Sequence, residues 1–192
     1  MANQLEKFGL KPYRKLDGTP LAGAQNRYTI KANYGSNIFQ GDLVVPVSTG
    51  NIEVSTYNTS EAVVGVFNGC FYTDPTTKKP TFSNFYPGGI AASDITAFVI
   101  DDPDAVFLID ADEAFTRADL YKNYSVTNTT GVTTTGLSKQ QLDGSVSGTA
   151  TTFAIQAIDI CQDPENSDTG SANANILVRI NNHFYRSGTG LA

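Results

Sequence analysis

The chain has 192 residues, of which 40% are hydrophobic and only 17% are charged, and its formal net charge at pH 7 is −6. Abundant Thr, Asn and Gly replace the missing charged residues and favour strands and loops over helices. The overall acidity excludes a typical nucleic-acid binder, which needs a basic face. No apolar run is long enough for a membrane span or a signal peptide, so we expect no Sec export and a protein made in the cytoplasm of its host.

Residues 1–26 are predicted to form an extended N-terminal arm, because Lys11-Pro12 and Thr19-Pro20 disfavour helix before each proline. Residues 1–31 carry six basic and two acidic side chains, a net charge of +4, whereas the other residues sum to −10. The segment Asp94–Asp119 alone holds eight carboxylates against a single arginine. We therefore predict that the arm docks onto an acidic surface, either of the protein itself or of a partner.

Residues 27–110 are predicted to form a β-barrel body of short strands separated by turn residues. A bend is expected at Gly41-Asp42, a bulge and a tight turn within the segment Glu61–Tyr72, and an exposed loop at Thr73–Pro80. The strand-like segments are Arg27–Ala32, Ile38–Val47, Ile52–Tyr57, Glu61–Tyr72, Thr81–Tyr86, Thr96–Ile100 and Val106–Ile109.

Residues 111–192 are predicted to form a C-terminal β-lobe with long loops. A short helix is expected over Asp112–Tyr121, a helical turn over Ser138–Leu142, and strands over Thr151–Ile160 and Asn175–Ile180. Many short strands between turns are typical of a sandwich or a barrel. The fold class predicted from the sequence is thus mainly β, a small β-barrel or sandwich with an extended arm, one or two short helices and a second β-lobe.

The sequence carries little that points to catalysis. His183 is the only histidine, and no nucleophile elbow, phosphate-binding loop or metalloprotease motif is present. Cys70 and Cys161 lie far apart and form no zinc-binding cluster; two buried free thiols are the simplest interpretation, and a disulfide is the alternative. We expect a protein that binds and does not catalyse, with no catalytic residue, no cofactor and no metal.

One segment resembles a known family. The run Asn37-Ile-Phe-Gln-Gly-Asp-Leu-Val44, a turn with Gly50, and then Val63-Val-Gly-Val66 are similar to a pattern in capsid decoration (cement) proteins of tailed bacteriophages. The resemblance covers about residues 27–67 and implies a non-enzymatic β-barrel protein that binds the outside of an assembled capsid and stabilises it. It also implies a trimer located on the virion surface, with the major capsid protein as its partner and neither nucleic acid nor membrane bound. The arm would then make the contact, and its candidate partner-binding residues are Leu5, Lys7, Phe8, Lys11, Arg14 and Lys15.

Two other functions stay open. A phage tail or head–tail connector component would also be structural and would form rings of higher order. A β-barrel hydrolase or carbohydrate-binding module would need an aromatic-lined cleft, which the run Phe82–Tyr86 could supply, although the chain has no Trp.

Overall fold

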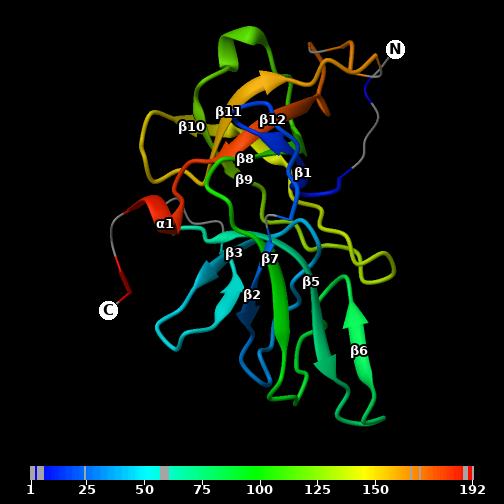
Figure 1. Ribbon diagram of the computed structural model, residues 1–192. Helices are drawn as coiled ribbons and strands as arrows, with labels where there is room; N and C mark the ends of the chain where they lie inside the picture. Colours follow the sequence, from blue (N-terminus) through cyan, green and yellow to red (C-terminus); the bar gives the residue numbers. More distant parts are fainter. Residues whose placement is uncertain are drawn as a thin grey trace.

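The computed structural model describes residues 3, 7–23, 25–56, 61–164, 166–168, 170–187 and 190–191. Within these ranges the protein is mainly β, as predicted, and its strands form two six-stranded antiparallel sheets. Figure 1 shows the sheets in two lobes, with sheet A in the upper lobe and sheet B in the lower lobe. Neither sheet closes into a barrel, so the barrel that the sequence suggested is not formed.

Sheet A joins the N-terminal segment to the C-terminal part of the chain. Its strands lie in the spatial order β1 (Lys11–Lys15), β8 (Ala105–Asp110), β12 (Asn175–Ile180), β11 (Ile155–Ile160), β9 (Asn123–Val126) and β10 (Leu142–Gly148). The central strands β8 and β12 are buried along most of their length, as their continuous apolar runs require. Strand β1 occupies one end of this order, so only one of its edges is paired.

Sheet B is built from residues 25–100. Its strands follow the order β2 (Gln25–Thr29), β7 (Thr96–Ile100), β5 (Gly65–Thr73), β3 (Leu43–Pro46) and β4 (Ile52–Val54), and β6 (Pro80–Ser83) pairs with the far end of β5. The predicted bend at Gly41-Asp42 is confirmed: Gly41 has a φ of 97°, in the left-handed region that favours glycine. The predicted bulge in β5 is also confirmed by a register shift between Phe67 and Cys70, but the tight turn expected there is absent, since β5 continues to Thr73.

One of the two apolar cores unites the lobes. It contains residues of sheet B such as Leu43, Val66 and Ile100 together with Phe107 and Val178 of sheet A. A second core lies within the lower lobe, around Phe67, Tyr86 and Val99. Because the larger core contains residues of both sheets, the two lobes are packed against each other and are not separate units joined by a linker.

The structure divides the chain differently from the three segments 1–26, 27–110 and 111–192 that the sequence suggested. The chain passes from sheet B to sheet A in the turn Asp101–Asp104, so β8 belongs to the upper lobe and not to the body. Strand β1 lies within the predicted arm but pairs with β8 along Lys11–Lys15. Apolar alternation indicates that a strand is buried; it does not indicate which sheet the strand joins.

The helices are also not where the sequence placed them. The predicted helix Asp112–Tyr121 is reduced to a 3₁₀ turn, η1 (Arg117–Asp119), because Asp112 accepts a hydrogen bond from the Gly144 amide at 2.9 Å instead of beginning a helix. The helical turn expected at Ser138–Leu142 is absent, since Ser138 N bonds the carbonyl of Gln40 and Gln141 O accepts from Thr127 N. A short helix, α1 (Phe184–Ser187), follows His183.

Candidate functional site

His183, the only histidine, lies buried where the C-terminal segment meets the lower lobe. Its backbone bridges to Val63, and its Nδ1 accepts a hydrogen bond from the Tyr185 amide at 3.2 Å. Burial lowers the pKa of the imidazole, and the positive charge of Arg186 lowers it further. The neutral ring therefore serves as a packing element, and its hydrogen bond fixes the start of α1.

The two cysteines are both buried and free. Burial raises the pKa of the Cys70 thiol to about 12, and the thiol points to the Phe85 carbonyl at 3.6 Å. The alternative of a disulfide between Cys70 and Cys161 is therefore wrong for this structure. Among the residues that the structure describes, no three His, Cys, Asp or Glu side chains gather into a group that could hold a metal ion.

The six candidate partner-binding residues differ in their exposure and contacts. Leu5 lies outside the described residues, and Lys7 and Lys11 are exposed. Phe8 is half-buried in the cleft between the lobes, while Arg14 donates to the Lys15 carbonyl at 3.1 Å. Lys15 is engaged within the protein, where its ammonium meets Asp102 at 2.8 Å.

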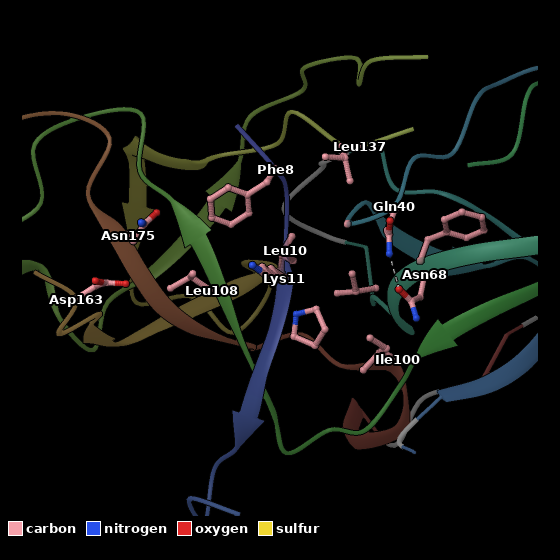
Figure 2. Close-up of a pocket in the computed structure, with 14 residues that line it drawn as sticks. Phe8, Leu10, Lys11, Gln40, Asn68, Ile100, Leu108, Leu137, Asp163 and Asn175 are labelled. Carbon is pink, nitrogen blue, oxygen red and sulfur yellow. Dashed lines mark hydrogen bonds between the residues drawn. The ribbon is translucent and has the colours of Figure 1, made fainter. Parts of the chain in front are cut away.

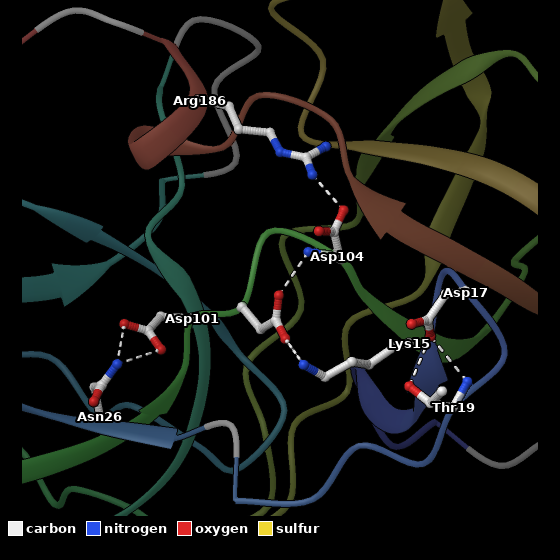
Figure 3. A network of polar contacts seen from close by, with 8 residues as sticks. Lys15, Asp17, Thr19, Asn26, Asp101, Asp104 and Arg186 are labelled. Carbon is white, nitrogen blue, oxygen red and sulfur yellow. Dashed lines mark hydrogen bonds and ion pairs between the residues drawn. The ribbon is translucent and has the colours of Figure 1, made fainter.

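Figure 3 shows the polar network that surrounds Lys15 at the junction of the two lobes. Asp102 pairs with Lys15 of β1, and Asp104 pairs with Arg186 of α1. Asp101, which is almost fully buried, accepts hydrogen bonds from the Asn26 amide at 3.0 Å. The turn Asp101–Asp104 thus connects β1, β2 and α1. Two carboxylates of the acidic segment are paired with basic groups of the same chain.

The pKa values in this network follow from its contacts. The hydrogen bond from Lys15 holds the pKa of Asp102 below its usual value and raises that of Lys15. Burial raises the pKa of Tyr28, and the hydrogen bonds of its hydroxyl to Asp101 at 2.6 Å and to Tyr185 at 2.6 Å act in the same direction. The shifted pKa values leave Lys15 charged, Asp102 ionised and the Tyr28 hydroxyl protonated near neutral pH, as expected of a structural junction.

A cleft of about 540 Å³ separates β1 from the top of sheet B. In Figure 2, Leu108 of β8 and Ile100 of β7 lie on opposite sides of β1, and Phe8 and Leu137 lie at one end. Its polar lining includes Lys11 and a hydrogen-bonded amide pair, in which Gln40 donates to the Asn68 carbonyl at 2.9 Å. Because its lining mixes apolar side chains with the polar ones of Lys11, Gln40, Asn68, Asp163 and Asn175, the cleft suits a group of a ligand or partner that is apolar in part and polar in part.

The aromatic run Phe82–Tyr86 does not line one cleft. Phe82 is exposed, whereas Tyr86 is fully buried and donates its hydroxyl to the Tyr34 carbonyl at 3.0 Å. Phe85 stacks on Phe39 with ring centroids 5.6 Å apart. Only Phe82 belongs to β6, which ends at Ser83, and Phe85 and Tyr86 follow it with different surroundings. The aromatic cleft expected for a hydrolase or carbohydrate-binding module is therefore not assembled by this run.

Sequence reasoning found the basic N-terminal residues but missed the surfaces beside them. The cleft combines residues as distant in the chain as Phe8, Asn68, Leu137 and Asp163, and no local pattern signals their proximity. The exposed side of β5, β6 and β7 was equally hidden, although the alternation of Thr96–Ile100 could have shown that Phe98 faces away from the buried Ala97 and Val99.

None of the described helices is both long enough and apolar enough to cross a membrane. No protein-family model, curated protein or solved structure matches this chain.

Proposed function

We propose that this protein is a virion structural protein that binds the outer surface of an assembled phage capsid and stabilises it. The observation that carries the proposal is the local structure of the segment on which the resemblance rests. Gly41-Asp42 bends the chain into β3, β3 pairs with β4 as a hairpin, and β3 pairs again with Gly65 and Val66 of β5. This is the strand, hairpin and returning strand that the resemblance to decoration proteins implies.

The N-terminal edge supports the same proposal. Tyr13 on β1 is 52% exposed, and Lys7 and Lys11 beside it are exposed too. A basic and aromatic strip at a sheet edge is suited to an acidic protein surface, because aromatic side chains supply contact area and the cations supply complementarity. The partner proposed is the major capsid protein, and the protein itself is proposed to be a trimer.

The experiment is co-sedimentation with capsids assembled without this protein. The wild-type chain is expected to pellet with the shells, and binding is expected to weaken as salt rises, since exposed charges are screened within about 10 Å at 0.1 M. Lys11→Glu with Arg14→Glu should lower occupancy. The matched control, Arg117→Glu with Lys122→Glu, makes the same change of charge in and beside η1, before β9 and far from β1 in the strand order of sheet A, and should bind as the wild type does.

Absence of wild-type protein from the pellet would refute the proposed function. Equal loss of binding in both double variants would show that only net charge matters and would remove the role of β1. Light scattering of the free protein separates the proposed trimer from the larger rings expected of a tail or connector component.

A further inference from the structure

The outer face of sheet B carries a cluster of phenylalanine rings. Phe82 of β6 is 64% exposed and Phe71 of β5 is 40% exposed, and the two are direct cross-strand partners. Phe71 also pairs with Thr96, which lies two residues before Phe98 on the same side of β7. The rings of Phe82 and Phe98 approach with centroids 6.1 Å apart. Phe71, Phe82 and Phe98 therefore form one patch, named here the phenylalanine stripe.

The bulge in β5 provides the floor of the stripe. Gly69 has a φ of 124°, and a Cβ at this position would lie 3.1 Å from the ring tip of Phe82. Any other residue would therefore be strained in its backbone and would push the ring away. The glycine lets Phe82 lie flat over the backbone towards Phe98, which holds a large ring in an exposed position.

The stripe continues into the cleft beside β1. Ile100 lies two residues beyond Phe98 on the same side of β7 and lines the cleft together with Asn68 and Lys11 (Figure 2). Arg27 of β2 is the cross-strand partner of Phe98 and shares its face. Arg27 therefore borders the stripe, and the cleft beside β1 begins at Ile100, which is itself only 5% exposed.

Charges of both signs lie around this surface, and the positive ones are at the end next to β1. The ion pairs among the described residues are Lys15–Asp102, Lys122–Asp119 and Arg186–Asp104, and none of them uses Arg27 or Lys11. At the other end of the stripe, Asp94 accepts from the Thr73 hydroxyl at 2.6 Å and Asp74 accepts from the Thr77 amide at 2.7 Å; these hydrogen bonds lower the pKa of each carboxyl and keep it negatively charged. Asp163 also lines the cleft that contains Lys11. The complement of an apolar stripe with Arg27 and Lys11 at one end is an apolar protein surface that presents carboxylates at that end.

We infer that the phenylalanine stripe, together with Arg27 and the edge of β1, is the face of the protein that binds the capsid shell. The inference rests on the proposed function and goes beyond it, because it assigns the main contact to sheet B and not to the N-terminal segment alone. The shell would present carboxylates opposite Arg27 and Lys11 and apolar side chains opposite Phe82 and Phe98. The aromatic rings supply the affinity, and the cations set the orientation.

The test compares Phe82→Thr and Phe98→Thr with a control, Tyr121→Asn, in the co-sedimentation assay. Threonine keeps strand propensity, and Tyr121 is an equally exposed aromatic residue (74%) in the upper lobe, with a φ of 66° that asparagine tolerates. Covering the exposed part of Phe82 removes roughly 130 Å² of apolar surface from water, so Phe82→Thr should bind about 100-fold more weakly. Arg27→Glu tests the rim without removing a ring and should weaken binding by at least about tenfold at low salt. Thermal unfolding of each variant confirms that it is folded.

The outcomes are distinguishable. Loss of wild-type binding to shells overturns both this inference and the proposed function. If the Phe82→Thr and Phe98→Thr variants bind the shells as tightly as the wild type does, the inference alone is overturned. A wild-type oligomer that dissociates to monomers with Phe82→Thr, before any shell is added, shows that a second copy covers the stripe and also overturns the inference.

Discussion

Asp42 is a buried carboxylate whose environment predicts a pH dependence of stability. It is 2% exposed, and its Oδ2 accepts a hydrogen bond from the Phe39 amide at 2.8 Å. Burial raises the pKa of Asp42 from 3.8 to about 6, although hydrogen bonds from the Ser138 side chain and the Phe39 amide partly oppose the shift. The carboxylate belongs to the bend before β3, and Ser138 comes from the loop before β10, so the group lies where the two lobes meet.

The sign of the effect follows from linkage. Between the unfolded pKa of 3.8 and the folded pKa of about 6, the folded protein binds more protons at Asp42 than the unfolded chain does. The contribution of Asp42 to the free energy of unfolding is therefore greatest below pH 4 and falls as the pH rises through 6. A shift from 3.8 to about 6 corresponds to about 3 kcal/mol of stability lost at neutral pH relative to the protonated form.

Asp42→Asn isolates this contribution. The asparagine carbonyl can accept from the Phe39 amide as Oδ2 does, so this hydrogen bond is kept while the charge is removed. We expect the variant to be more stable than the wild type at pH 7.5 by up to about 3 kcal/mol, and equally stable at pH 4. Urea unfolding between pH 4 and pH 8 measures both curves. If the free energy of unfolding of the variant falls between pH 4 and pH 6 as steeply as that of the wild type, the reasoning is refuted.

Asp74→Asn is the matched control with the opposite sign. Hydrogen bonds from the Thr77 and Thr76 amides lower the pKa of Asp74, so its contribution to stability is present above pH 4 and lost as the pH falls through its folded pKa. The difference in free energy of unfolding between the Asp74→Asn variant and the wild type should therefore shrink towards acid pH. It should not show the decline from pH 4 to pH 6 that Asp42 causes. A matching decline in both comparisons would show that the measured slope belongs to the whole molecule and not to Asp42.

Two further predictions concern packing. Gly65→Ala should lower the free energy of unfolding in urea by about 3 kcal/mol or more, because the new Cβ would lie 2.3 Å from the Ile100 carbonyl and 2.7 Å from Val99. Gly35→Ala, where nothing lies within 4 Å, should change it by less than about 0.5 kcal/mol. Similar losses in both variants would contradict the close contact of β5 with β7. The Cys70 thiol, with its pKa raised to about 12 by burial, should react with a thiol reagent at pH 8 only as fast as the protein opens, and reaction at the rate of a free thiol would show that it is accessible.

The strands that the sequence predicted best are those whose burial is visible in a short window. Thr96–Ile100 and Asn175–Ile180 are rich in β-branched and aromatic or apolar residues, and both form strands over those residues. Strand β1 was hidden because Pro12 and three basic residues give it no apolar period. The helix expected at Asp112–Tyr121 failed because tertiary contacts decided its conformation: Phe115 is buried beside Tyr124, with ring centroids 5.7 Å apart.

The candidate binding surface was predictable only in its charge. The excess of positive charge in residues 1–31 identified Lys7 and Lys11 as candidate contacts, but it could not separate them from Lys15, which is paired within the chain. Arg27 gained its significance from its register with Phe98. Such pairings depend on which strands become neighbours, and a single sequence does not contain that information in local form.

The pairing of Lys15 with Asp102 also limits what charge can do at the proposed interface. Both side chains are partly exposed, at 35% and 18%, so water screens the pair and it adds little to stability. The β1–β8 ladder and the burial of Leu10 must therefore hold the strand in place. The same physics applies to Lys11 and Arg27 when they meet carboxylates at the rim of a contact. Their effect should fall mainly on the rate of association and on its salt dependence, whereas dissociation should depend on the rings of Phe82 and Phe98. Kinetic measurements on Arg27→Glu and Phe82→Thr would therefore separate the two roles within one surface.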